Sequence, residues 1–131
     1  MTGTNPTDQI RAAAELLRAL ATAASTDETG RPTARWYFTE HGRHDSGYLY
    51  AANPTGPGAR ILRGGSSGPH GRGLRPHLAA RHGEYIAAMD PTVGFALAAW
   101  LDSAVEDAGQ VGPDPHALAV ARQILDQETE R

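Results

Sequence analysis

The 131-residue chain contains no cysteine, no lysine and no long uninterrupted apolar run. Without cysteine, disulfides and thiolate metal sites are excluded. Since no apolar run reaches about 18 residues, we expect no membrane span. The opening residues show no basic stretch followed by an apolar one, so we expect no signal peptide and a cytoplasmic protein. Without lysine, all 12 cationic side chains are arginine, a planar and permanently charged group suited to phosphate or carboxylate.

The charges are distributed unevenly along the chain. From Arg31 to His82 there are eight arginines and two carboxylates, whereas residues 83–131 hold two arginines and nine carboxylates. The net charge of −3 therefore conceals a basic middle and an acidic C-terminal part. Such an asymmetry points to an anionic partner or to self-association.

Hydrophobic periodicity and turn residues predict a single α+β domain over residues 1–131. Asn5-Pro6 reads as a helix start, and Asp90-Pro91 and Asp114-Pro115 repeat that signal. We expect an N-terminal helix and linker at 1–30, followed by a small antiparallel sheet of about three strands at 31–63. A flexible basic glycine-rich loop should follow at 64–75. The C-terminal region, 76–131, should be helical, opening near Pro76 and ending in a C-terminal helical hairpin.

The basic middle also holds the candidate binding site. Arginine forks and glycine-rich backbone amides suit a phosphate, and aromatic side chains on a sheet suit a stacked base. Alternation places Trp36 and Phe38 on one face of the first strand and Tyr37 on the other. The candidate ligand-binding residues are Arg60, Arg63, Arg72, Arg75, Arg81, His77, Trp36, Tyr48 and Tyr50.

Bland interpretations of the same residues stay open: a solvated loop without a specific ligand, and aromatic side chains that pack a small sheet. No nucleophile motif or acid–base pair stands out, and His77 and His82, five residues apart on a helix, would face about 140° apart. We therefore expect no enzyme activity, no catalytic residue, no metal and no cofactor. The acidic helices and negative net charge argue against binding duplex nucleic acid.

One segment carries a family resemblance. It reads EYIAAMDPTV from Glu84 and continues to Leu97 and Leu101. Over Glu84–Leu101 the chain resembles small phage and prophage accessory proteins, including Ead-like proteins and uncharacterised actinobacterial relatives, which often carry (F/H/Y)-I-A-x-x-(D/N)-P near the C-terminus. The resemblance implies a dispensable cytoplasmic protein of phage or prophage origin, and it brings no agreed biochemical activity.

Two functions follow as hypotheses. The first is a non-enzymatic binding protein that holds an anionic, nucleotide-like small molecule between the basic segment and the sheet, and that in a phage setting sequesters a host nucleotide signal. The alternative is a protein–protein interaction or homo-oligomerisation module. In that case the basic middle pairs with the acidic helices of a second copy or with an acidic protein surface.

Overall fold

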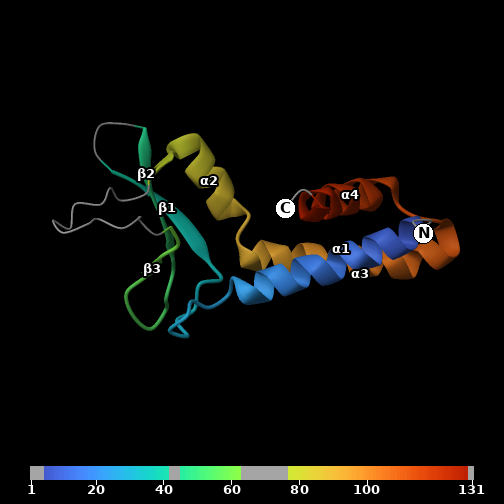
Figure 1. Cartoon of the computed structure of the whole chain (residues 1–131), viewed down its shortest axis with the longest axis horizontal. Coiled ribbons are helices and arrows are strands. Elements are labelled where there is room, and N and C mark those ends of the chain that lie inside the picture. The colour runs from blue at the N-terminus through green and yellow to red at the C-terminus, as the bar shows by residue number, and fades with distance from the viewer. Residues whose placement is uncertain (1–4, 42–44, 63–76, 130–131) are drawn as a thin grey trace. The chain divides into compact units, whose positions relative to one another are not determined.

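The computed structural model of the chain describes residues 5–41, 45–62 and 77–129 (Figure 1). Within these ranges the chain forms four helices and a small antiparallel sheet, so the predicted α+β class is confirmed. The chain divides into two compact units. Residues 1–23 and 93–131 form one, called here the helical unit, and residues 24–92 form the other, called the sheet unit. The division into two compact units does not test whether they fold as one domain, so the single domain stays a prediction.

The helical unit consists of α1 (Pro6–Ala23), α4 (Pro115–Thr129) and α3 (Pro91–Val111) from Val93 onward. Its helix starts follow from capping. The Asn5 side-chain oxygen accepts the Asp8 backbone N–H at 2.8 Å, and Asp114 accepts that of His116 at 2.8 Å. After a short turn the chain reverses direction from α3 into α4, which agrees with the predicted helical hairpin (Figure 1).

The end of α3 lies beyond the residue that the sequence suggested. Gly109 looks like a helix terminator, but the helix continues to Val111. Gly112 follows with a φ of +84°, a left-handed conformation that glycine adopts without steric cost. Gly109 is therefore an interior helical glycine with open space around its Cα.

Small side chains build most of the core of the helical unit. Ile10 and Leu101 are its fully buried large side chains among the described residues. Around them lie the buried alanines of all three helices, which let the helix backbones approach closely: Ala13, Ala14, Ala104, Ala117 and Ala121. Trp100 falls on the apolar stripe of the sequence, yet it keeps 40% of its surface exposed.

The sheet unit is built around a central strand. β2 (Ser46–Ala51) pairs antiparallel with β1 (Trp36–Glu40) along one edge. Its other edge pairs with the two-residue strands β3 (Ala59–Arg60) and β4 (Leu78–Ala79), at opposite ends of β2. The predicted hairpin and third strand are therefore present, and β4 adds a short fourth strand.

The helix α2 (Ala80–Ala88) belongs to the sheet unit. The sequence placed a helix start near Pro76, but Leu78 pairs with Gly47 in the sheet, and the helix begins only at Ala80. The Ala80 N–H donates to the Asp45 carbonyl oxygen at 2.9 Å, so sheet pairing competes with helix formation in this stretch.

A close approach between α2 and β1 fixes which sheet face the helix covers. A Cβ built on Gly83 would lie 2.2 Å from Cδ1 of Phe38, far inside van der Waals contact. The glycine that weakens the helix signal in the sequence thus allows α2 to lie directly on the Phe38 ring. The opposite face of the sheet carries other side chains.

Candidate functional site

Three tyrosines share the sheet face opposite to α2. In the strand register Tyr37 stands beside Tyr50 and Thr39 beside Tyr48. The Tyr37 and Tyr50 rings are stacked with centroids 5.5 Å apart, and Tyr48 meets Tyr50 edge-on at 6.4 Å. We call this surface, Tyr37, Tyr48 and Tyr50, the tyrosine face. Tyr37 is 42% exposed, so an aromatic surface is accessible there.

Arg60 lies beside the tyrosine face because it pairs with Tyr50 across β2 and β3. Its side chain is exposed and has no hydrogen-bond or ion-pair partner among the residues that the structure describes. A shallow hollow of about 410 Å³ opens next to it. The hollow is lined by Asp27, Arg31, Tyr50, Gly58, Ala59, Arg60 and Leu62. It places two guanidinium groups beside an aromatic ring.

Asp27 organises the loop that brings Arg31 to this hollow. One carboxylate oxygen accepts the Thr29 hydroxyl at 2.6 Å and the backbone N–H groups of Thr29 and Arg31 at 2.9 and 3.0 Å. The other accepts Arg31 Nε at 3.2 Å. These bonds, the Thr29 hydroxyl first, hold the pKa of Asp27 well below its usual range. Arg31 is therefore partly neutralised, and Arg60 is the more available cation.

Trp36 lies on the other face of the sheet. It pairs with Ala51, and its indole N–H donates to the Thr33 carbonyl oxygen at 2.6 Å. It lines a separate hollow of about 260 Å³ that Arg60 and Asp27 also border. The structure thus separates two side chains that the sequence offered as equivalent stacking candidates, because Tyr48 is on the tyrosine face and Trp36 is not.

The remaining predicted residues do not lie beside Arg60, Tyr48 and Tyr50. Arg81 is exposed on α2, and α2 packs on the Phe38 side of the sheet. His77 is exposed just before β4. Arg63, Arg72 and Arg75 lie outside the described residues. Of the nine predicted side chains, the structure brings together Arg60, Tyr48 and Tyr50 on or beside the tyrosine face, and it brings Trp36 to the separate hollow that Arg60 also borders.

Sequence reasoning left out two contributors to this surface. Tyr37 was placed on the face opposite to Trp36, and the same alternation, combined with the hairpin register, would have paired it with Tyr50. His41, whose ring centroid is 4.6 Å from that of Tyr48, extends the aromatic row at the far end. The role of Asp27 in positioning Arg31 has no comparable sequence signal beyond the turn composition.

The end of the hairpin away from Arg60 is acidic. A hydrogen bond between Glu40 and Asp45, then burial, and then repulsion from Asp45 and Glu84 raise the pKa of Glu40. Crowded carboxylates at this end disfavour an anion there, whereas Arg60 and Arg31 favour one at the other end. The electrostatic potential therefore changes along β2, from negative near Glu40 to positive near Arg60.

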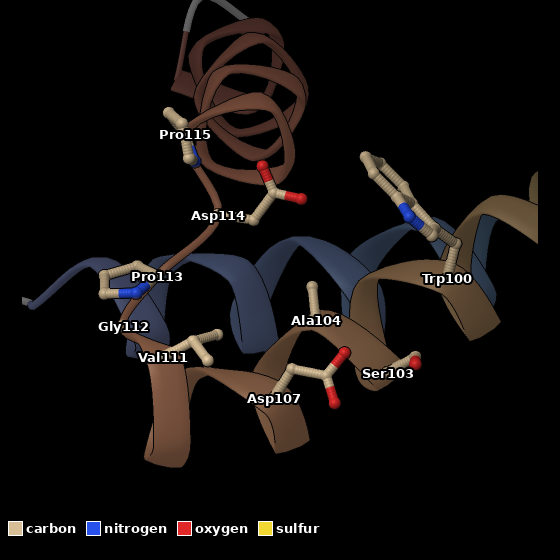
Figure 2. Close-up of a pocket in the computed structure, with 9 residues that line it drawn as sticks. All are labelled: Trp100, Ser103, Ala104, Asp107, Val111, Gly112, Pro113, Asp114 and Pro115. Carbon is tan, nitrogen blue, oxygen red and sulfur yellow. The ribbon is translucent and has the colours of Figure 1, made fainter.

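A third hollow lies in the helical unit, between α3 and the start of α4 (Figure 2). It has a volume of about 320 Å³ and is lined by Trp100, Ser103, Ala104, Asp107, Val111, Gly112, Pro113, Asp114 and Pro115. In Figure 2 the Asp114 carboxylate points to the side where Trp100 stands, and the Asp107 carboxylate points towards Ser103. The tyrosine face has arginines beside its aromatic rings, whereas this hollow has carboxylates beside an aromatic ring.

Over the described ranges, no three histidine or carboxylate side chains stand close enough together to hold a metal ion. No described helix combines the length and apolar character that crossing a membrane requires. Models of known protein families do not match the chain, and comparisons with curated proteins and with solved structures also find no match.

Proposed function

We propose that the chain is a non-enzymatic binding protein that holds an anionic, nucleotide-like small molecule on the tyrosine face. The observation that carries the proposal is the placement of Arg60 directly beside Tyr50, over a hollow of about 410 Å³. This volume lies within the range of small-molecule sites. A ligand that combines an aromatic ring with phosphate meets both kinds of side chain at once.

The tyrosines would take the aromatic part of the ligand. The ring planes of Tyr37 and Tyr50 are inclined by 25° to each other, and the two rings present a broad π surface. Stacking of one base on an aromatic side chain contributes about 1–3 kcal/mol. The stacking is tolerant of base identity, so the tyrosine face would select a class of compounds and leave fine selection to other contacts.

Arg60 would take the phosphate. Its guanidinium is unpaired within the described part of the chain, and Arg31 stands across the same hollow. A guanidinium binds phosphate through two parallel hydrogen bonds. The acidic cluster of Glu40, Asp45 and Glu84 repels an anion from the opposite end, so the phosphate would point towards β3. In the phage setting that the Glu84–Leu101 resemblance implies, we propose that the role is to sequester a host nucleotide signal.

The test is a thermal-shift and calorimetric titration of the purified chain with mono-, di- and cyclic nucleotides. Ligand that co-purifies should appear as absorbance at about 260 nm released on denaturation, as expected for a bound base. Arg60→Gln should weaken binding about ten- to hundredfold, because a charge-assisted hydrogen bond to phosphate is lost.

Arg81→Gln is the matched control, since it removes the same charge from the α2 side of the sheet unit. It should leave nucleotide affinity unchanged. Clean protein with no shift across the panel would overturn the proposal, and so would equal losses in the two arginine variants.

A further inference from the structure

The hollow between α3 and α4 has the lining of a cation site. Asp107 is exposed and has no partner among the residues that the structure describes. Asp114 uses one carboxylate oxygen to accept the His116 backbone N–H, and no other side chain in the described ranges bonds to the second oxygen. Trp100 presents its partly exposed indole on the same hollow (Figure 2). A cation over an indole and beside carboxylates gains both cation–π attraction and charge pairing.

The surroundings reinforce this preference. Residues 93–131 carry seven carboxylates and two arginines. An anion would be repelled, and a neutral ligand would desolvate the carboxylates without replacing their lost hydrogen bonds. A guanidinium suits the site better than an ammonium, because its flat face stacks on an indole while its edge donates to carboxylates. Arginine is also the chain's own cationic side chain.

A complementary surface exists on α2. Arg81 and Tyr85 are four residues apart and so lie along one stripe of α2, and Met89 follows as the residue that caps the helix at its C-terminus. Tyr85 is 69% exposed and Met89 46% exposed, and Arg81 is exposed without a partner in the described ranges. Gly83 holds the other side of α2 against the sheet. The stripe thus offers one guanidinium followed by apolar surface.

We propose that the chain self-associates by docking the α2 stripe of one copy into the α3–α4 hollow of a second copy. Arg81 then stacks on Trp100 between Asp107 and Asp114. Tyr85 covers Val111, which is 83% exposed in the single chain. Charge complementarity selects the partner, and a contact this small gives a weak, salt-sensitive association rather than a permanent one.

The experiment is sedimentation velocity of the full chain over a range of concentrations, at about 0.05 M and about 0.5 M salt, which brackets the screening of exposed charges. We expect association that strengthens with concentration and weakens at high salt. Asp107→Asn and Arg81→Gln should each lower the association constant roughly five- to tenfold. The double variant Arg81→Gln with Asp107→Asn should lose less than the sum of the two single losses, because each single change already breaks the pairing between these two side chains.

Glu106→Gln is the matched control, because it removes one negative charge from the neighbouring position of α3 without lining the hollow. It should leave the association constant unchanged. Circular dichroism checks that each variant is folded. A chain that stays monomeric at every concentration would overturn the inference. Equal effects of Asp107→Asn and Glu106→Gln would also overturn it, as would losses that simply add in the double variant.

Discussion

Gly83 and Gly109 are both interior helical glycines, and the structure predicts opposite outcomes when each is replaced by alanine. Alanine stabilises a helix interior by about 1 kcal/mol relative to glycine at either position. At Gly109 no atom lies within 4 Å of the added methyl group. Gly109→Ala should therefore raise the free energy of unfolding by up to about 1 kcal/mol.

At Gly83 the same methyl group collides with a ring. It would lie 2.2 Å from Cδ1 and 2.3 Å from Cε1 of Phe38, whereas carbon atoms settle at about 3.5–4.0 Å. Either the ring or the helix must move by more than about 1 Å, and such overpacking costs about 1–3 kcal/mol. After the gain in helix propensity, Gly83→Ala should lower the free energy of unfolding by up to about 2 kcal/mol. The difference between the two variants isolates the collision, since the propensity terms largely cancel.

The assay is equilibrium urea unfolding, followed by circular dichroism and by tryptophan fluorescence. In a Trp100→Phe background the fluorescence comes from Trp36, which is bonded within the sheet unit and so reports on that unit. Phe38→Leu should relieve most of the penalty of Gly83→Ala, and a double-mutant cycle measures this coupling. A Gly83→Ala variant as stable as Gly109→Ala would refute the packing of α2 on Phe38.

Three further predictions follow from individual contacts. Because hydrogen bonds depress the pKa of Asp27, its ionised form stabilises the fold above its ordinary pKa of 3.8, and this contribution is lost as pH falls through the lower folded-state value. Urea midpoints should thus show Asp27→Asn less stable than the parent at about pH 7, with the gap closing in acid; a gap constant with pH would contradict this. Asp90 is 9% exposed, and its carboxylate accepts hydrogen bonds from the Trp36 backbone N–H at 3.0 Å and from the Thr92 hydroxyl. Asp90→Ala should cost about 2–4 kcal/mol of unfolding free energy, and Asp90→Asn clearly less. Arg18 and Asp102 form an ion pair with both side chains more than 40% exposed, so Asp102→Asn should cost under about 1 kcal/mol, and the cost should vanish in high salt.

Local sequence signals predicted the elements well. The capping residues Asn5 and Asp114 mark helix starts because a cap bonds to the backbone two or three residues away. Alternation placed Trp36 and Tyr37 on opposite faces of β1, which the register confirms. The start of α2 was misplaced because pairing between Leu78 and Gly47, residues far apart in the chain, decides the conformation there.

The candidate sites depended on contacts that no local pattern encodes. Trp36 and Tyr48 looked equivalent until the strand register put them on opposite faces. Arg60 and Arg81 looked equivalent until Gly83 fixed α2 on the Phe38 side. The hollow beside Trp100 is lined by residues of α3, of the turn that follows it and of the start of α4, whereas periodicity alone would bury that indole.

The sequence by itself determined the charge asymmetry, the use of arginine as the only basic side chain other than histidine, and the order of the helices and of the first three strands. These features depend on composition and on neighbours within a few residues. Only the tertiary structure determined which arginine lies beside which aromatic ring. Strand register joined Arg60 to Tyr50, and a glycine contact turned Arg81 away from them. These pairings depend on distances between residues remote in the chain, and folding alone sets such distances.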